Sequence, residues 1–173
     1  MDPFIELLKI ILPAAIVFLT SFYLIKNFLE NEHKNRSLNL KIASRELSTP
    51  IRLQAYERVV LFLERISPNS LVMRMNKPMF TSRQFHSELI AAVRSEFEHN
   101  LSQQIYMSAE AWEMVKNAKE EIVKLINLSA IKIPDSAPSS ELAQLLIEAS
   151  AKLKALPTSM AIAYIKKEIG QSF

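Results

Sequence analysis

The hydrophobic positions of the chain follow two patterns, one continuous and one periodic. Residues 10–25, between Lys9 and Lys26, form a run of sixteen uncharged residues, IILPAAIVFLTSFYLI. The run has no polar face, and apolar residues extend it on both sides. A membrane-spanning helix needs roughly 20 mostly apolar residues. We therefore predict a transmembrane helix over about residues 4–26, so that residues 1–26 form an N-terminal anchor.

Two other interpretations of this run are weaker. A cleaved signal peptide begins with basic residues and ends with small ones, whereas the first eight residues carry only the acidic Asp2 and Glu6. A helix buried in a soluble core would show a polar face and be bounded by turn signals. Pro13 lies inside the run, and proline is tolerated in membrane helices.

The charge distribution predicts the orientation of the span. Residues 26–77 carry ten Lys or Arg against five Glu. Cytoplasmic flanks of membrane helices are enriched in Lys and Arg. We therefore expect a single-pass protein of the inner (cytoplasmic) membrane, with the N-terminus outside and the C-terminal domain in the cytoplasm. Membrane lipids are the expected partners of residues 4–26 and of this basic flank. The interspersed Glu residues argue against nucleic acid as a partner.

Residues 27–49 are predicted to form a polar, basic connector. Within it SLNLKI, residues 37–42, alternates polar and apolar residues, which weakly indicates an extended segment. Thr49 followed by Pro50 is typical of a helix start, because the hydroxyl caps the first turn and proline suits its first position.

Residues 50–130 show helical periodicity and predict a helical domain. The first helix should end at Ser67 and Pro68, before a less regular connection. Thr81 or Ser82 is expected to cap the next helix, and Ser108 the one after it. The predicted apolar faces of these three helices are, in turn, Leu53, Tyr56, Val59, Val60, Leu63 and Ile66; Phe85, Leu89, Ile90, Val93, Phe97, Leu101 and Ile105; and Trp112, Val115, Ala118, Ile122 and Ile126.

The C-terminal part is predicted to be a helical hairpin at residues 141–173, after a Pro/Ser linker at residues 131–140. The last helix should follow Pro157. The expected apolar positions are Leu142, Leu145, Ala149, Leu153 and Leu156, which form a seam, and then Met160, Tyr164 and Ile165. The seam could be covered within the chain or by a second copy. The predicted fold class is all-α: one N-terminal transmembrane helix plus a cytoplasmic bundle of about five helices.

The composition excludes several kinds of site. The chain has no Cys and a single Gly, at position 170, so thiolate sites and glycine-rich phosphate loops are ruled out. Glu-x-x-His occurs at residues 30–33 and 96–99, a spacing that recurs in di-iron helix bundles. Both motifs fall on polar faces, so we expect solvated turns. His86 lies on an apolar side and is expected to be a satisfied, half-buried residue. No cofactor or metal is expected.

One group of residues stands out as a candidate for binding a protein partner: four charged residues together with a tyrosine of the apolar face. The candidate residues, all in the helix predicted to start at Pro50, are Arg52, Tyr56, Arg58, Glu64 and Arg65. The segment RLQAYERVVLFLERISP, residues 52–68, together with the following LVMRM and the N-terminal span, resembles an uncharacterised family of small membrane-anchored proteins from Bacteroidetes. The resemblance covers most of the chain and implies no activity.

These features favour a non-enzymatic role. We expect a membrane-anchored cytoplasmic helical module that acts as an adaptor, assembly factor or small subunit of a membrane complex. The alternative is a membrane-bound enzyme with a carboxylate–histidine or metal site, which would need Glu and His side chains converging in a pocket. A structural strut would need one long unbroken helix, and the prolines, beginning with Pro50, argue against it.

Overall fold

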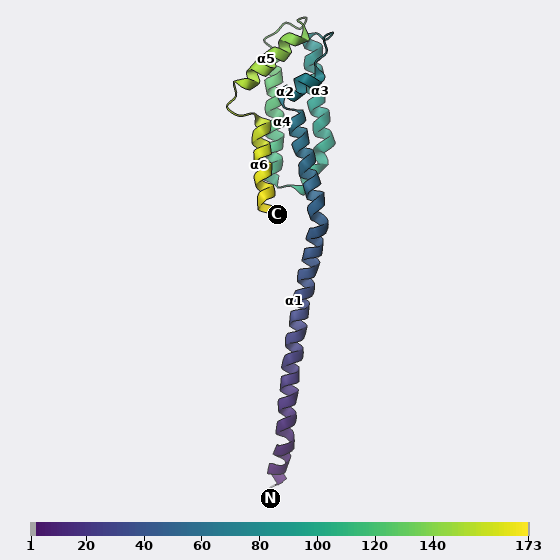
Figure 1. The fold of residues 1–173 in the computed structure, drawn as a ribbon, viewed down its shortest axis with the longest axis vertical. Helices are drawn as coiled ribbons and strands as arrows, with labels where there is room; N and C mark the ends of the chain where they lie inside the picture. The colour runs from purple at the N-terminus through teal and green to yellow at the C-terminus, as the bar shows by residue number, and fades with distance from the viewer. Residues whose placement is uncertain (1–2, 173) are drawn as a thin grey trace. The chain divides into compact units, whose positions relative to one another are not determined.

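All regular elements are helical in the computed structural model, over the residues that it describes (Figure 1). In chain order they are α1 (Pro3–Arg65), α2 (Pro68–Met75), α3 (Ser82–Asn100), the 3₁₀ helix η1 (Leu101–Tyr106), α4 (Ala109–Ala130), α5 (Ser139–Ala151) and α6 (Pro157–Ser172). The prediction of an all-α fold is confirmed.

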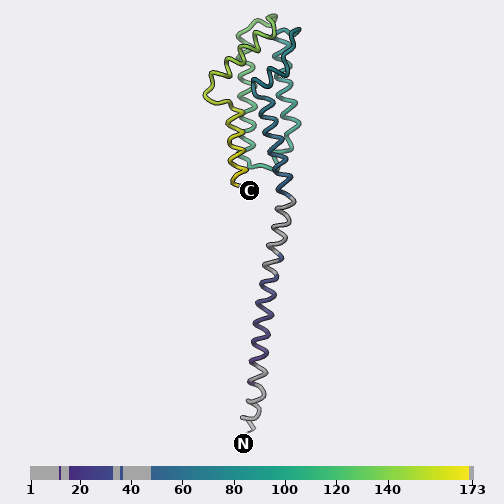
Figure 2. The backbone as a smooth tube through the Cα atoms, viewed as in Figure 1, coloured from purple at the N-terminus to yellow at the C-terminus, as the bar shows by residue number. Residues whose placement is uncertain are grey.

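The structure describes the backbone of residues 3–172 and the side chains of residues 12, 16–32, 36 and 48–171 (Figure 2). Within the described part, no helix is both long and apolar enough to cross a membrane. The predicted span at residues 4–26 includes residues 4–11 and 13–15, whose side chains lie outside the described set.

The chain divides into two units, residues 1–49 and residues 50–173. In the second unit α4 packs against α3, α5 and α6, and α5 also contacts α2 and α3 (Figure 1). The large side chains of this core are fully buried; they include Tyr56, Phe62, Leu63, Ile66, Leu71, Phe85, Leu89, Ile122, Ile126, Leu142, Leu146 and Ile165. Burying a side chain of this size contributes about 1.5–3 kcal/mol, so this core is the main source of stability.

An aromatic series joins three helices inside the second unit. The ring centroids of Phe62 and Phe97 are 5.9 Å apart, and those of Phe97 and Trp112 are 5.6 Å apart. Offset and tilted pairs at such distances add about 0.5–1.5 kcal/mol each beyond area burial. Lys119 places its Nζ 4.5 Å from the Phe97 ring centroid, so α1, α3 and α4 are fixed at this level.

The loops before α3 and α5 are held together by hydrogen bonds. The Ser82 amide donates to the Ala137 carbonyl at 2.7 Å, and the Ser139 amide donates to the Phe80 carbonyl at 3.0 Å. The Ser139 hydroxyl lies 2.8 Å from Asn76 Oδ1 and 3.0 Å from the Lys77 carbonyl. These bonds satisfy backbone groups that turns would otherwise leave unpaired, and they fix α5 beside α2 and α3.

The predicted helix starts at residues 81 and 108 are confirmed. Thr81 and Gln84 form a capping box. The Gln84 amide donates to Thr81 Oγ1 at 3.3 Å, and the Thr81 amide donates to Gln84 Oε1 at 3.0 Å. Ser108 Oγ accepts from the Ala111 amide at 3.0 Å. Such caps satisfy amides that the first helical turn leaves without partners.

The predicted helix start at Pro50 is wrong, because α1 is helical from Pro3 to Arg65. The connector at residues 27–49 is helical as well, including the segment expected to be extended. Residues 27–49 contain no Gly or Pro, so nothing in them ends a helix. Proline removes one backbone hydrogen bond, and here the helix continues past it. The argument from Pro50 against a long helix therefore fails.

The predicted core positions at the end of α3 are also wrong. Leu101 is 43% exposed and Ile105 is 73% exposed. The α-helix ends at Asn100, and η1 has three residues per turn instead of 3.6. That change rotates the apolar stripe away from the core.

The two helices expected after the linker are present as α5 and α6, but their apolar face is shifted from the predicted one. α5 ends at Ala151, which leaves Leu153 42% exposed beyond it, and Met160 in α6 is 53% exposed. Leu142 and Leu146 are instead fully buried against α2, α3 and α4. Within the predicted seam, Leu145, Ala149 and Leu156 are half-buried and Leu142 alone is fully buried. Whether the seam is covered within the chain or by a second copy stays a prediction.

Between the two expected helices, the connection at residues 68–75 is itself a helix, α2. Leu71 and Val72 are buried, whereas Met73 is 84% exposed. Pro68 occupies the first position of α2, where its missing N–H costs nothing. A helix of eight residues gives only two turns, so its one buried face holds few side chains.

Candidate functional site

The five predicted partner-binding residues divide between the interior and the surface. Arg52 is half-buried and Tyr56 is 1% exposed, so both belong to the interior of the second unit. Arg58, Glu64 and Arg65 are exposed on α1. The periodicity placed Tyr56 on the apolar face of this helix, and its burial agrees with that placement. That these five residues bind a partner stays a prediction.

Tyr56 takes part in a polar cluster whose centre is the carboxylate of Glu168 in α6. The Tyr56 hydroxyl donates a hydrogen bond to Glu168 Oε1, which also accepts the Ser108 amide at 3.0 Å. The Ser108 hydroxyl donates to Glu168 Oε2. Both carboxylate oxygens are thus occupied by donors from α1 and from the first residue before α4. We call these residues, with Arg52, the Glu168 cluster.

Arg52 is the fourth member of the cluster and connects it to η1. Its Nη2 donates to the Tyr56 hydroxyl at 3.2 Å, and its Nε donates to the Tyr106 carbonyl at 3.2 Å. The guanidinium carbon lies 5.9 Å from the centroid of the Tyr56 ring. The cluster therefore joins α1, the loop before α4, and α6 through charge-assisted hydrogen bonds, which are stronger than neutral ones.

The cluster shifts the pKa values of its acidic members in opposite directions. Burial raises the pKa of Tyr56, and the hydrogen bond to Glu168 raises it further, against the opposing charge of Arg52. Burial also acts to raise the pKa of Glu168, but the hydrogen bonds from Ser108 and Tyr56 outweigh it and leave this pKa below its ordinary value. Glu168 is therefore held as a carboxylate and Tyr56 as a neutral phenol.

Sequence reasoning missed Glu168 as a member of the site. It lies 112 residues from Tyr56 and 60 from Ser108, and helical periodicity says which face a residue occupies but not what it meets. A local signal did exist, because Glu168 lies three residues after the fully buried Ile165, on the same side of α6.

A second charged group lies at the junction of α1, α2 and α3. Glu96 Oε1 is 2.8 Å from Arg65 Nη2 and 2.8 Å from Arg74 Nη1. Arg74 also donates to the Arg65 carbonyl at 3.2 Å. Glu96 is half-buried, so the expectation that it faces solvent is wrong. Its carboxylate is engaged by arginines from two neighbouring helices.

The histidines have partners other than carboxylates. His86 Nε2 is 2.8 Å from Asn127 Oδ1, as expected of a satisfied, half-buried histidine. His99 Nδ1 is 2.7 Å from the Ser95 carbonyl of its own helix. His33 lies outside the described side chains. Among the described residues, no three His, Asp or Glu are grouped as a metal site would require.

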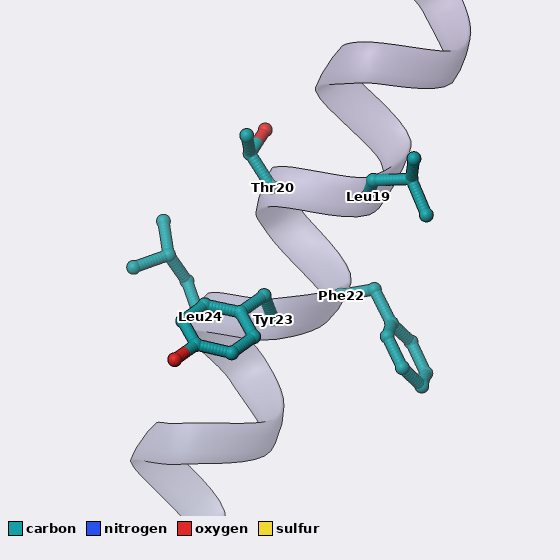
Figure 3. A pocket seen from close by; sticks show the side chains of 5 residues that line it. All are labelled: Leu19, Thr20, Phe22, Tyr23 and Leu24. Carbon is teal, nitrogen blue, oxygen red and sulfur yellow. The ribbon is translucent and has the colours of Figure 1, made fainter.

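Among the described side chains of the first unit, those of residues 16–25 present apolar groups on all sides of the helix. Figure 3 shows Leu19 and Phe22 on one side of the helix, and Thr20, Tyr23 and Leu24 on the other. These five residues line a surface hollow, but all come from one stretch of α1 and cannot enclose a ligand. The Thr20 hydroxyl donates to the Ile16 carbonyl at 2.9 Å, which leaves the surface here almost wholly apolar.

A second, shallow groove lies beside α5 and has a mixed lining. Two of its acidic residues, Glu141 and Glu148, project from α5 together with Gln144, which donates to Glu148 at 2.9 Å. Lys132 and Ile133 from the preceding loop complete it. The groove does not include the Glu168 cluster, Glu96 or either described histidine.

Comparison with known families identifies the relationship of the chain. A family of unknown function, DUF7935, matches residues 2–172, and the chain belongs to this family. No curated protein and no solved structure matches the chain. Family membership therefore brings no activity or ligand to the residues described above.

Proposed function

We propose that this DUF7935 member is a membrane-anchored cytoplasmic helical interaction module. It acts as an adaptor, assembly factor or small subunit of a membrane complex and needs no catalysis of its own. The first unit supplies the anchor and the second unit supplies the surface that a protein partner recognises.

The observation that carries the proposal is the apolar surface on all sides of α1 between residues 16 and 25, which Phe28 and Leu29 continue beyond Lys26 and Asn27. Neighbouring residues of a helix point about 100° apart, so four consecutive apolar residues cover every side. A helix that is apolar all round belongs in a membrane or a protein interior. The exposed fractions here run from 50% to 69%, for Ile16, Val17, Phe18, Leu19, Phe22, Tyr23, Leu24, Ile25, Phe28 and Leu29. Lipid acyl chains provide the cover that the chain itself does not.

The orientation of the anchor follows from the residues after it. The excess of Lys and Arg at residues 26–77 favours a cytoplasmic location for everything that follows the anchor. The same basic residues attract anionic lipid headgroups of the cytoplasmic leaflet. The resemblance to small membrane-anchored proteins supports the same arrangement.

The best candidate for the partner surface is the exposed face of α1 in the second unit. Arg58, Leu61 and Glu64 lie at spacings of three on this face, and all three are exposed, Leu61 by 55%. Arg58 is the residue of this face that the composition of protein interfaces favours most, because arginine is enriched at interfaces. Arg65 borders the face and pairs with Glu96.

The experiment that tests this proposal is an affinity pull-down of the tagged full-length protein from membranes solubilised in mild detergent. We expect a defined membrane complex to co-purify, and Arg58→Glu to reduce its recovery at least tenfold, because an interface arginine often contributes more than 1.4 kcal/mol.

Arg94→Glu is the matched control, since Arg94 is an exposed arginine on α3. It should leave recovery unchanged. If the wild-type protein emerges alone, or if both substitutions reduce recovery equally, the proposed partner surface is wrong.

A further inference from the structure

We propose that Arg52, Tyr56 and Ser108 form a carboxylate-binding site that Glu168 occupies as an internal ligand, and that an acidic side chain of a partner protein takes its place. In the structure the site is occupied by the side chain of Glu168, which belongs to α6 of the same chain. The inference rests on the proposed role as an interaction module for the existence of a partner, whereas the site itself can be tested without one.

Every donor of the site comes from outside α6. The Tyr56 hydroxyl, the Ser108 hydroxyl and the Ser108 amide converge on the Glu168 carboxylate, and the positive charge of Arg52 acts on it as well. Donors left without an acceptor in a half-buried place are unfavourable. When Glu168 leaves, another carboxylate is therefore the group that best satisfies them.

The C-terminal turns of α6 can separate from the core more easily than its N-terminal turns. Ala161, Ile162 and Ile165 are at most 8% exposed and hold the first part of the helix in the core. After Ile165 only Glu168 and Ile169 are half-buried, while the other described residues, 166, 167, 170 and 171, are exposed. Helix ends with few apolar contacts open at little free-energy cost. The last turns of α6 therefore depend on two side chains, Glu168 in its cluster and Ile169 against the core.

Gly170 weakens this end further. It is the single glycine of the chain, and a Cβ added to it would meet nothing within 4 Å. Packing therefore does not require a glycine here, although glycine is among the poorest helix formers. Its position two residues after Glu168 makes fraying of the internal ligand easier.

The first test removes the internal ligand and supplies a carboxylate from solution. Full-length Glu168→Ala protein in mild detergent is unfolded by heat at pH 7 in sodium acetate and in sodium chloride of equal ionic strength. We expect acetate to raise the midpoint of the variant by about 2–4 °C, the shift typical of one well-made interaction in a chain of this size. The wild-type midpoint should not differ between the two salts.

The double variant Glu168→Ala, Tyr56→Phe is the control, because it lacks one donor of the site. Its response to acetate should fall by at least half. Equal midpoints of Glu168→Ala in acetate and chloride would overturn the proposal. A response to inorganic phosphate without one to acetate would overturn the assignment to a carboxylate.

The second test uses the wild-type chain and so does not depend on the folding of a variant. Acetate should increase hydrogen exchange of the amides at residues 168–171 at least twofold over chloride, because it competes with Glu168. Gly170→Ala should reduce that increase, since alanine stabilises the helix end. If acetate does not change the exchange at these amides, the proposal is wrong. That result would leave membrane association, and with it the proposed anchor, unaffected.

Discussion

The folded state stabilises the charged form of Glu168, its carboxylate. Its pKa is lowered because hydrogen bonds from Ser108 and Tyr56 outweigh burial. A carboxylate whose pKa is lowered by folding stabilises the fold above its unfolded pKa, about 4.3 for Glu, and this contribution is lost as pH falls through the folded value. Tyr56 behaves oppositely: because burial raises its pKa, its contribution is complete below about pH 10 and is lost as pH rises.

Replacement of Glu168 by Gln should therefore flatten the acid side of the stability profile. We expect the free energy of unfolding of the wild type to decrease between about pH 5 and pH 3, and that of Glu168→Gln to decrease less over the same range. Urea unfolding at several pH values measures both. Glu57→Gln, at an exposed position of α1, should keep the wild-type slope. Equal slopes for all three proteins would mean that Glu168 is not held as described.

At this scale the sequence predicts what depends on near neighbours. The caps Thr81 and Ser108 were found because a cap and the amides that it binds lie within three residues. Arg52 and Tyr56 were recognised as polar candidates, but their partner Glu168 comes from the other end of the chain. The cluster exists only once α1, α4 and α6 have packed together, so no local pattern could reveal it.

At the scale of elements, the helix starts marked by the caps Thr81 and Ser108 were predicted, whereas the end of α3 was not. The end of α3 illustrates the reason: Leu101 and Ile105 continue the helical spacing, yet the chain changes to the 3₁₀ helix η1 after Asn100. Hydrophobic periodicity shows which positions are apolar along the sequence. The residue at which a helix ends depends instead on whether the next turn still packs against another helix. Pro50 shows the converse, since a start signal occurs inside a helix that is already formed.

Two alanine substitutions separate the predicted stripe from the observed one. Leu89→Ala should lower the free energy of unfolding by about 2–5 kcal/mol, because Leu89 is fully buried and the change leaves a cavity. Ile105→Ala should change it by less than about 0.5 kcal/mol, because Ile105 is 73% exposed. Chemical denaturation of the two variants measures this difference. Similar losses in both would mean that α3 continues as one helix through residue 105.

At the scale of the whole molecule, the two units differ in what covers their apolar side chains. The second unit buries its large side chains among its own helices. The first unit leaves those of residues 16–29 exposed. Under the proposed function, the acyl chains of a bilayer would cover these exposed side chains.

Charges introduced into this segment should therefore weaken membrane association. A lysine near the centre of a membrane helix costs about 2.5–3.5 kcal/mol, so Ile16→Lys with Leu19→Lys should move most of the protein from the membrane pellet to the supernatant after alkaline carbonate washing.

Met79→Lys is the matched control, because Met79 is 94% exposed but lies in the second unit. It adds a lysine at an even more exposed apolar position and should leave the protein in the pellet. If all variants remain with the wild type in the pellet, the apolar segment does not determine the location. If the wild type itself is washed off, its cover is a protein and not a bilayer.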